Sequence, residues 1–397
     1  MQQKDTLFFY LFIEFFWGMI YNNLVNFRKR SNKMKKRIFS LILIASLLLT
    51  LGGCKDNKKD VSSIKPSSKP SSVEKEPEPQ FAINPLTGVR DLELDAVKLK
   101  PVAIMINNMA DAQSVQSSLS KADIIYETYA EGGITRLMAV YKDIRAVGKY
   151  NIGSLRSGRY SYVDLALGHG AQFVHAGLDE DYCTPHIREL GIQSFDLNTT
   201  AIYSNVIGGN NYAFRTSNGL SYEHTLYTTG NKLYKGLKKN FKMKLKSEQE
   251  NWMNFVDEDK KYVPKGSCSK IYVPFSGSMY SAEFKFNKET KRYDKYRSGA
   301  KQKDYSTGEE ISVDNILVLY SSVTAFSDGY HVMTHLDSGE GYYVSNGGYR
   351  KIKWEKGSAT SSFKIKDTKG NIIDFNPGKT YVCLTNTSNK SATTITK

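Results

Sequence analysis

The stretch that decides the fold begins with PVAIMINN (residues 101–108) and resumes with ADIIYETYAEGGITRLMAVYKD (122–143). Each part contains an unbroken apolar run about as long as one strand, and such runs are typical of strands buried on both faces of a sheet. The pair Gly132-Gly133 divides the second part, because adjacent glycines favour a turn. We therefore expect these segments to form the central strands of a covered sheet.

Around this centre, strand-like and helix-like segments alternate. KYNIGSLRS (149–157) and AQFVHAGL (171–178) are predicted strands, and SYVDLALGHG (161–170) between them has apolar residues at helical spacing. NKLYKGLKKNF (231–241) is a predicted basic amphipathic helix. Alternation of this kind predicts an α/β domain, a mixed sheet with helices, over residues 81–244.

The second half of the chain has a different pattern of polar and apolar residues. A polar connection over residues 245–266 leads into short stretches of alternating polarity, separated by turn signals such as NGG (346–348) and KGN (369–371). Short strands at regular spacing predict a small sandwich or barrel. We expect a smaller all-β domain over residues 267–390, followed by a tail of residues 391–397.

The N-terminal region carries the pattern of a secretion signal. From Met34 the sequence reads MKKRIFSLILIASLLLTLGGC, in which basic residues precede an apolar run that ends in small residues and Cys54. This is the layout of a signal peptide, and LGGC matches the lipobox of bacterial lipoproteins. We expect cleavage of residues 34–53, lipidation of Cys54, and anchoring to the outer face of the cytoplasmic membrane.

Two further segments flank this signal. Residues 1–33 are interpreted as a non-native upstream extension, with translation starting at Met34; the alternative is a genuine interfacial extension. Residues 54–80 are rich in Ser, Pro, Lys and Glu and poor in apolar residues. Such a segment cannot bury enough surface to offset its ordering entropy, so we expect a flexible stalk.

The net charge and the cysteines indicate which binding partners and cofactors to expect. The net charge is +15, which suits anionic lipids and wall polymers, although simple solubility is an equally good explanation. Nucleic acid would also suit this charge, but export makes it an improbable partner. The four cysteines are far apart and show no metal-binding spacing, so no metal or other cofactor is expected.

Several blocks of the sequence carry a family resemblance. They include NPLTG (84–88), PVAIMINN, EGGITRL (131–137), IGSLRSGR (152–159), VHAG (174–177) and EHTLYT (223–228). In this order the blocks resemble the YerB-like lipoproteins of Gram-positive bacteria, a domain of unknown function, over about residues 81–390. The resemblance implies a lipid-anchored two-domain protein and, for one member, a proposed helicase partner, but no enzyme activity. SLRSGR stands where PVRSAR is expected, and EHTLYT has Glu223 where the family pattern has proline.

Charged residues gather at the predicted strand ends of the first domain. The candidate ligand-binding residues are Arg156, Ser157, Arg159, Arg136, Glu127, Glu131 and Asn107. Ligand-binding side chains often lie at strand ends beside glycines. Two arginines three residues apart could each donate paired hydrogen bonds to a phosphate or carboxylate. The alternative is that the arginines pair with Glu127, Glu131 or Asp164 and only order the loops.

Two histidines are candidate acid/base groups. His175 and His224 could act with Asp164 or Glu223, although a hydrogen-bonding role in the core is the commoner use of such residues. No nucleophile–base motif is present, which favours a binding module for an envelope partner or an anionic cell-wall or lipid-linked ligand. The alternative is an enzyme that acts on a phosphate-containing cell-wall precursor.

Overall fold

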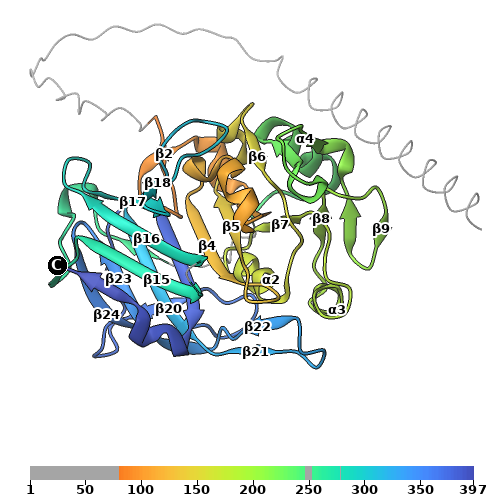
Figure 1. Cartoon of the computed structure of the whole chain (residues 1–397). Coiled ribbons are helices and arrows are strands. Elements are labelled where there is room, and N and C mark those ends of the chain that lie inside the picture. Colours follow the sequence, from red (N-terminus) through yellow and green to blue (C-terminus); the bar gives the residue numbers. More distant parts are fainter. Residues whose placement is uncertain (1–79, 246–252, 278) are drawn as a thin grey trace, which may run out of the picture. The chain divides into compact units, whose positions relative to one another are not determined.

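One sheet of 13 strands contains strands from both halves of the chain (Figure 1). The structure, a computed structural model, describes residues 80–245, 253–277 and 279–397. In spatial order the strands are β14 (Gly266–Ser267), β24 (Gly348–Glu355), β23 (Ser338–Ser345), β20 (Asn315–Ser321), β27 (Thr380–Asn386), β4 (Ile124–Tyr129), β5 (Thr135–Tyr141), β3 (Val102–Ile106), β7 (Gln172–His175), β8 (Ser194–Asp196), β10 (Val206–Gly208) and β9 (Ile202–Tyr203), with β25 (Lys364–Lys366) beside β24.

The N-terminal part of this sheet confirms the predicted mixed α/β domain. Strand β5 is antiparallel to both β3 and β4, whereas β3, β7, β8 and β10 run parallel. Helix α2 (Tyr160–Leu167) packs with Ala103 and Met105 on one face. Helix α4 (Gly230–Asn240) packs its Leu233 with Ile104 on the other face. Both faces are therefore covered, as the apolar runs predicted. A third helix, α3 (Cys183–Glu189), follows β7.

The predicted strand at residues 149–157 is wrong over most of its length. Only β6 (Asn151–Gly153) is a strand, and it belongs to a separate antiparallel sheet with β12 (Leu226–Thr229) and β11 (Phe214–Arg215). The chain then crosses the end of β3, where the amide of Asn107 donates to the carbonyl of Ser154 over 2.9 Å. This segment has too few consecutive apolar residues to hold a strand inside the main sheet.

The C-terminal half adds a second layer of strands. It is an antiparallel sheet formed by β18 (Ala300–Lys301), β17 (Arg292–Arg297), β16 (Tyr280–Asn287), β15 (Lys270–Ser276) and β28 (Thr394–Thr396), with β19 (Ser312–Val313) beside β17. Its Val273 and Phe284 pack with Val318 and Tyr381 of the main sheet. The C-terminal half is mainly strands, as expected, and one layer of its sandwich is an extension of the N-terminal sheet.

Strand β27 joins the two halves. It lies between β20 and β4, parallel to both, and its register with β4 runs from Thr380 opposite Ile124 to Cys383 opposite Glu127. Buried residues of both halves consequently belong to the same hydrophobic clusters. The two halves therefore share backbone hydrogen bonds and a core.

Three small pairs of strands complete the described structure. They are β1 (Ala82–Ile83) with β2 (Arg90–Leu92), β13 (Asn254–Phe255) with β26 (Asp374–Phe375), and β21 (Val323–Ala325) with β22 (Val332–Thr334). Strand β13 falls within the segment expected to be a polar connection, residues 245–266, and β14 begins at its last residue; both pair with C-terminal strands. No helix among the described residues is long and apolar enough to span a membrane. The upstream extension, the signal peptide, Cys54 and the stalk up to residue 79 lie outside the described residues.

Candidate functional site

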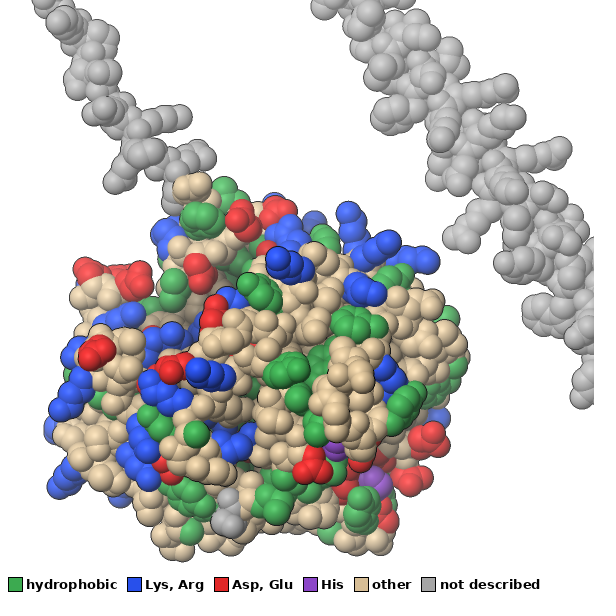
Figure 2. Space-filling model, turned by 45° about the horizontal axis from the view of Figure 1, so that its top comes forward, with side chains coloured by type: hydrophobic (Ala, Val, Ile, Leu, Met, Phe, Trp, Pro, Cys, Tyr) green, Lys and Arg blue, Asp and Glu red, His purple; other side chains and the backbone are tan. Residues whose placement is uncertain are grey.

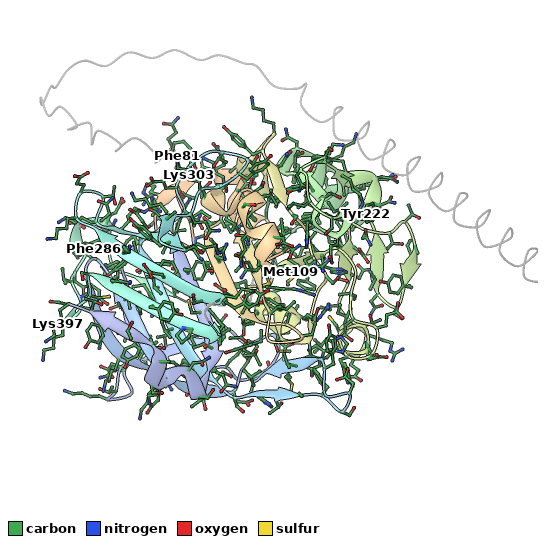
Figure 3. The ribbon with its side chains drawn as sticks, viewed as in Figure 1. Phe81, Met109, Tyr222, Phe286, Lys303 and Lys397 are labelled. Atoms are coloured by element: carbon green, nitrogen blue, oxygen red, sulfur yellow. The ribbon has the colours of Figure 1, made fainter. Side chains whose placement is uncertain are left out.

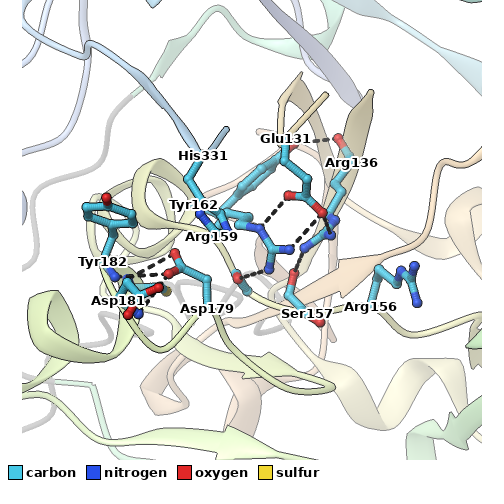
Figure 4. Close-up of polar contacts among 12 residues, drawn as sticks. Glu131, Arg136, Arg156, Ser157, Arg159, Tyr162, Asp179, Asp181, Tyr182 and His331 are labelled. Carbon is cyan, nitrogen blue, oxygen red and sulfur yellow. Dashed lines mark hydrogen bonds and ion pairs between the residues drawn. The ribbon is translucent and has the colours of Figure 1, made fainter. Parts of the chain in front are cut away.

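An ion cluster forms at the turn between β4 and β5 (Figure 4). Glu131 in this turn is 2.6 Å from Arg136 of β5, and it accepts two hydrogen bonds from Arg159, over 2.6 Å and 2.8 Å. Arg136 also donates to the carbonyl of Ser157, and Arg159 donates to that of Gly158. Most donors of both guanidinium groups are therefore directed at groups of this domain.

Burial sets the electrostatics of this cluster. Burial alone would raise the pKa of Glu131, but the charges of Arg136 and Arg159 outweigh it and lower that pKa. Burial, together with the neighbouring charge of Arg159, lowers the pKa of Arg136 to about 9. The side chain of Arg136 is only 3% exposed, so the cluster is a buried network in which one carboxylate holds two cations.

Arg156 has a different environment from Arg159, although the sequence placed the two arginines in one site. Arg156 lies 2.5 Å from Glu223 and contacts the sulfur of Met109, while its Nε is buried without a hydrogen-bond partner. Residues three apart in a non-helical, extended segment point to opposite sides. The structure therefore does not bring the two guanidinium groups to one ligand position.

Glu127 also lies apart from the arginines. In the β4–β5 ladder Glu127 pairs with Leu137, so Arg136 points to the opposite face of the sheet. The Glu127 carboxylate accepts hydrogen bonds from Asn108, Thr135 and Tyr381, and its side chain is 1% exposed. The predicted grouping of Glu127 with the arginines is wrong because alternate residues of one strand face different layers.

The candidate histidines have separate partners. His175 is buried between the carbonyl of Gly177 and the hydroxyl of Ser194, and burial lowers its pKa to about 4. His224 meets two predicted residues: Asn107, at 2.8 Å from its Nδ1, and Glu223, at 3.8 Å from its Nε2. The structure thus brings His224, Asn107 and Glu223 together.

Asp164 serves a histidine that the sequence did not single out. Its carboxylate lies 2.6 Å from Nε2 of His186 on α3, and it contacts neither His175 nor His224. The residue types that bind metal ions do not gather at one place in the described structure. No group of three or more His, Cys, Asp or Glu residues in the described ranges could hold a metal ion. Cys183, Cys268 and Cys383 are buried and free.

A broad basic groove is a feature that the sequence did not predict. It has a volume of about 1550 Å³ and lies between the segment that ends α4, the loops flanking β7 and β8, and the loop after β24. We call it the lysine groove. Its charged lining consists of Lys100, Lys239, Lys242, Lys244, Lys356, Lys364 and Glu355, and its apolar lining includes Leu167, Ala171, Phe173, Ile192, Phe241 and Leu245.

Three lysines of the lysine groove have no acidic partner among the described residues. Lys239, Lys242 and Lys244 are exposed and form no ion pair with any described residue. The acidic residue of the lining, Glu355, is paired with Lys366 at 2.7 Å, and Lys366 does not line the groove. Several like charges around one hollow produce a positive potential that attracts anions. Figure 2 shows Lys and Arg side chains scattered over one face of the molecule, with groups of them at the left and at the upper right.

One lysine of the lysine groove, Lys356, stabilises a loop. Lys356 is buried, and its ammonium group donates to the carbonyls of Ser358 and Ala359. Burial lowers the pKa of Lys356 to about 8. These hydrogen bonds close the loop after β24, which forms one wall of the groove.

Comparison with known proteins identifies the family. Two family models match the chain: the N-terminal domain of the protein of unknown function DUF3048 at residues 86–244 and its C-terminal domain at residues 271–382. YerB of Bacillus subtilis (strain 168), which is named as a candidate lipoprotein, is 26% identical over 302 residues, or 75% of this chain and 84% of the relative. The crystal structure of YerB from Bacillus subtilis has the same fold, with a TM-score of 0.64 and 24% identity, over 80% of this chain and 100% of that one. The chain therefore belongs to the YerB-like family, which is built from the two DUF3048 domains.

Proposed function

We propose that the protein is anchored by a lipid on Cys54 to the outer face of the cytoplasmic membrane and binds an anionic ligand of the cell envelope in the lysine groove. The lysine-lined hollow is the observation that carries the binding half of this proposal. The sequence LGGC after an apolar run, and the name of the Bacillus relative, support the anchor.

The chemistry of the groove favours a large ligand with repeated negative charges. Lysines carry compact charges on flexible stems, so they attract phosphates or carboxylates without demanding one fixed geometry. The volume of about 1550 Å³ exceeds the range of about 300–1,000 Å³ that is usual for small-molecule pockets. The apolar lining could accept the non-ionic part of such a ligand. These properties fit a segment of an anionic cell-wall polymer or of its lipid-linked form.

Neutralising the groove tests the binding. The triple variant Lys239→Gln, Lys242→Gln, Lys244→Gln should bind poly(glycerol phosphate) at least about tenfold more weakly than the wild type, equivalent to about 1.4 kcal/mol. The loss should be largest at low salt, because exposed charges are screened as ionic strength rises. Titration calorimetry at two salt concentrations measures both effects.

A matched control separates the groove from general charge. The variant Lys288→Gln, Lys303→Gln, Lys351→Gln removes the same charge from exposed lysines outside the groove. This control should bind almost like the wild type. Equal losses in the two triple variants, or no loss in the groove variant, would refute the assignment of the groove.

Replacing Cys54 tests the anchor. The variant Cys54→Ala should lose acyl labelling, and the protein should either appear in the medium or remain as an unprocessed precursor, because no thiol is available for the lipid. The variant Cys268→Ala, which removes a buried free cysteine, should keep the wild-type membrane partition. Unchanged labelling and partition of Cys54→Ala would contradict the lipid anchor.

A further inference from the structure

A second cationic feature lies between the two layers of the C-terminal half. Lys295 and Arg297 alternate with outward residues on β17, so both point toward the main sheet, where Glu127 lies on β4. Lys295 is 3% exposed and Glu127 is 1% exposed. Two cations and one carboxylate therefore occupy the same interior layer, which leaves an excess of positive charge.

The carboxylate does not neutralise these cations by direct contact. Glu127 accepts its hydrogen bonds from the neutral groups of Asn108, Thr135 and Tyr381, over 3.0, 2.9 and 2.5 Å. Among the described residues, neither Lys295 nor Arg297 forms an ion pair with it. A buried charge without a partner is costly, and such charges are seldom kept for stability alone.

One buried donor of this layer has no acceptor among the described residues. Nη1 of Arg297 is buried and has no hydrogen-bond partner among the described residues, and its Nη2 reaches Oδ1 of Asn108 only over 3.4 Å. Within the described residues the ammonium of Lys295 has no ion pair or side-chain hydrogen bond, and it lies 5.3 Å from the ring centre of Tyr381. Burial lowers the pKa of Lys295 to about 8, and it also lowers the pKa of Arg297. Nη1 of Arg297 is a buried donor of the kind that a bound acceptor would satisfy, and the ammonium of Lys295 adds a second positive charge beside it.

We propose that Arg297 and Lys295 form a binding site for a small oxyanion, a phosphate or carboxylate group, between β17 and β4. A guanidinium group offers two parallel donors to such an anion, and the ammonium adds a third donor and a second charge. Bound here, the anion neutralises the excess charge and occupies the free Nη1 of Arg297. This site is distinct from the lysine groove and does not depend on it.

The site has an approach from the surface. Arg297 ends β17 and is partly exposed, and Asn108, which it contacts, is followed by the partly exposed Met109 and the exposed Ala110. Met109 lies near the middle of Figure 3, beside the orange segments of the N-terminal half. On the far side of Met109, its sulfur contacts Arg156. One end of the proposed site therefore lies next to the partly exposed Arg297 and Met109 and the exposed Ala110.

Thermal unfolding with inorganic phosphate tests the proposal. The wild-type protein should gain melting temperature as phosphate replaces chloride at constant ionic strength, because a ligand of the folded state stabilises it by mass action. In Lys295→Met the apparent phosphate affinity should fall at least tenfold. Without phosphate this variant should melt no lower than the wild type, because it removes an unpaired buried charge. An acetate series shows whether a carboxylate serves equally well.

Two further variants keep the test decisive. Lys285→Met on the adjacent strand β16 removes a half-exposed lysine paired with Glu283 at 3.4 Å, and it should keep the full phosphate response. Arg297→Lys preserves the positive charge but removes the two parallel N–H donors of the guanidinium group. This variant should fold, and phosphate should raise its melting temperature less than that of the wild type. A wild type that shows no phosphate response would overturn the site, as would a response that survives in Lys295→Met and Arg297→Lys. A large fall in melting temperature of phosphate-free Lys295→Met would instead assign Lys295 as the counter-ion of Glu127.

Discussion

Replacing Glu131 by Gln is expected to lower the free energy of unfolding by about 3–5 kcal/mol, the usual cost of breaking a buried ion pair from one side. The substitution keeps the size of the side chain but removes the charge that holds Arg136 and Arg159. Two guanidinium groups would then remain in the interior without a counter-ion. Equilibrium unfolding in denaturant measures the loss.

An exposed ion pair provides the matched control. Glu309→Gln removes the partner of Lys121, whose side chain is 31% exposed, and it should cost less than about 1 kcal/mol. Because the pKa of Glu131 is lowered in the folded state, its contribution is complete above its unfolded value and is lost as the pH falls through the folded one. The difference between wild type and Glu131→Gln should therefore shrink in acid. A loss no larger than that of the control would show that Glu131 is not the counter-ion of this cluster.

Separating the two halves of the chain should have the largest effect on folding. A fragment of residues 80–245 lacks β27 and so leaves the edge of β4 unpaired, with its buried Ile125 exposed. A fragment of residues 253–397 leaves the corresponding edge of β27 open. Unpaired apolar edges are sites of aggregation, so we expect each fragment alone to be insoluble or to lack cooperative unfolding.

Co-expression distinguishes this expectation from simple truncation damage. The two fragments produced together should form a soluble complex, because the β4–β27 ladder and the shared core can form between separate chains. Gel filtration and thermal unfolding of the co-expressed and single fragments measure the difference. Cooperative unfolding of either fragment alone would show that the halves are independent domains despite the shared sheet.

The sequence predicted local structure better than the contacts between distant segments. The apolar runs at residues 101–108 and 122–129 identified β3 and β4, because burial on both faces leaves a continuous hydrophobic signal. The choice of β27 as the neighbour of β4 left no comparable signal. Both strands are almost wholly buried, and the periodicity of a strand does not encode which other strand pairs with it.

In the candidate site, too, contacts between residues close in sequence could be predicted, and contacts between distant segments could not. The nearness of Glu131 and Arg136 follows from one short turn, and the pairing of Glu223 with His224 follows from adjacency. The lysine groove could be anticipated only through the basic run of residues 231–244. Its other lysines, Lys100, Lys356 and Lys364, come from segments that meet only after folding.

The position of β27 also has a consequence for the time course of folding. A chain made from its N-terminus completes β4 at Tyr129, yet the neighbour of β4 spans Thr380–Asn386, close to the last residue, Lys397. Until β27 has emerged, the sheet of the first half has one open edge at β4. Native contacts of such long sequence separation slow folding. They also prolong the lifetime of folding intermediates that expose apolar surface and tend to aggregate. The edge of β4 therefore needs protection from aggregation until β27 has been made and has paired with it.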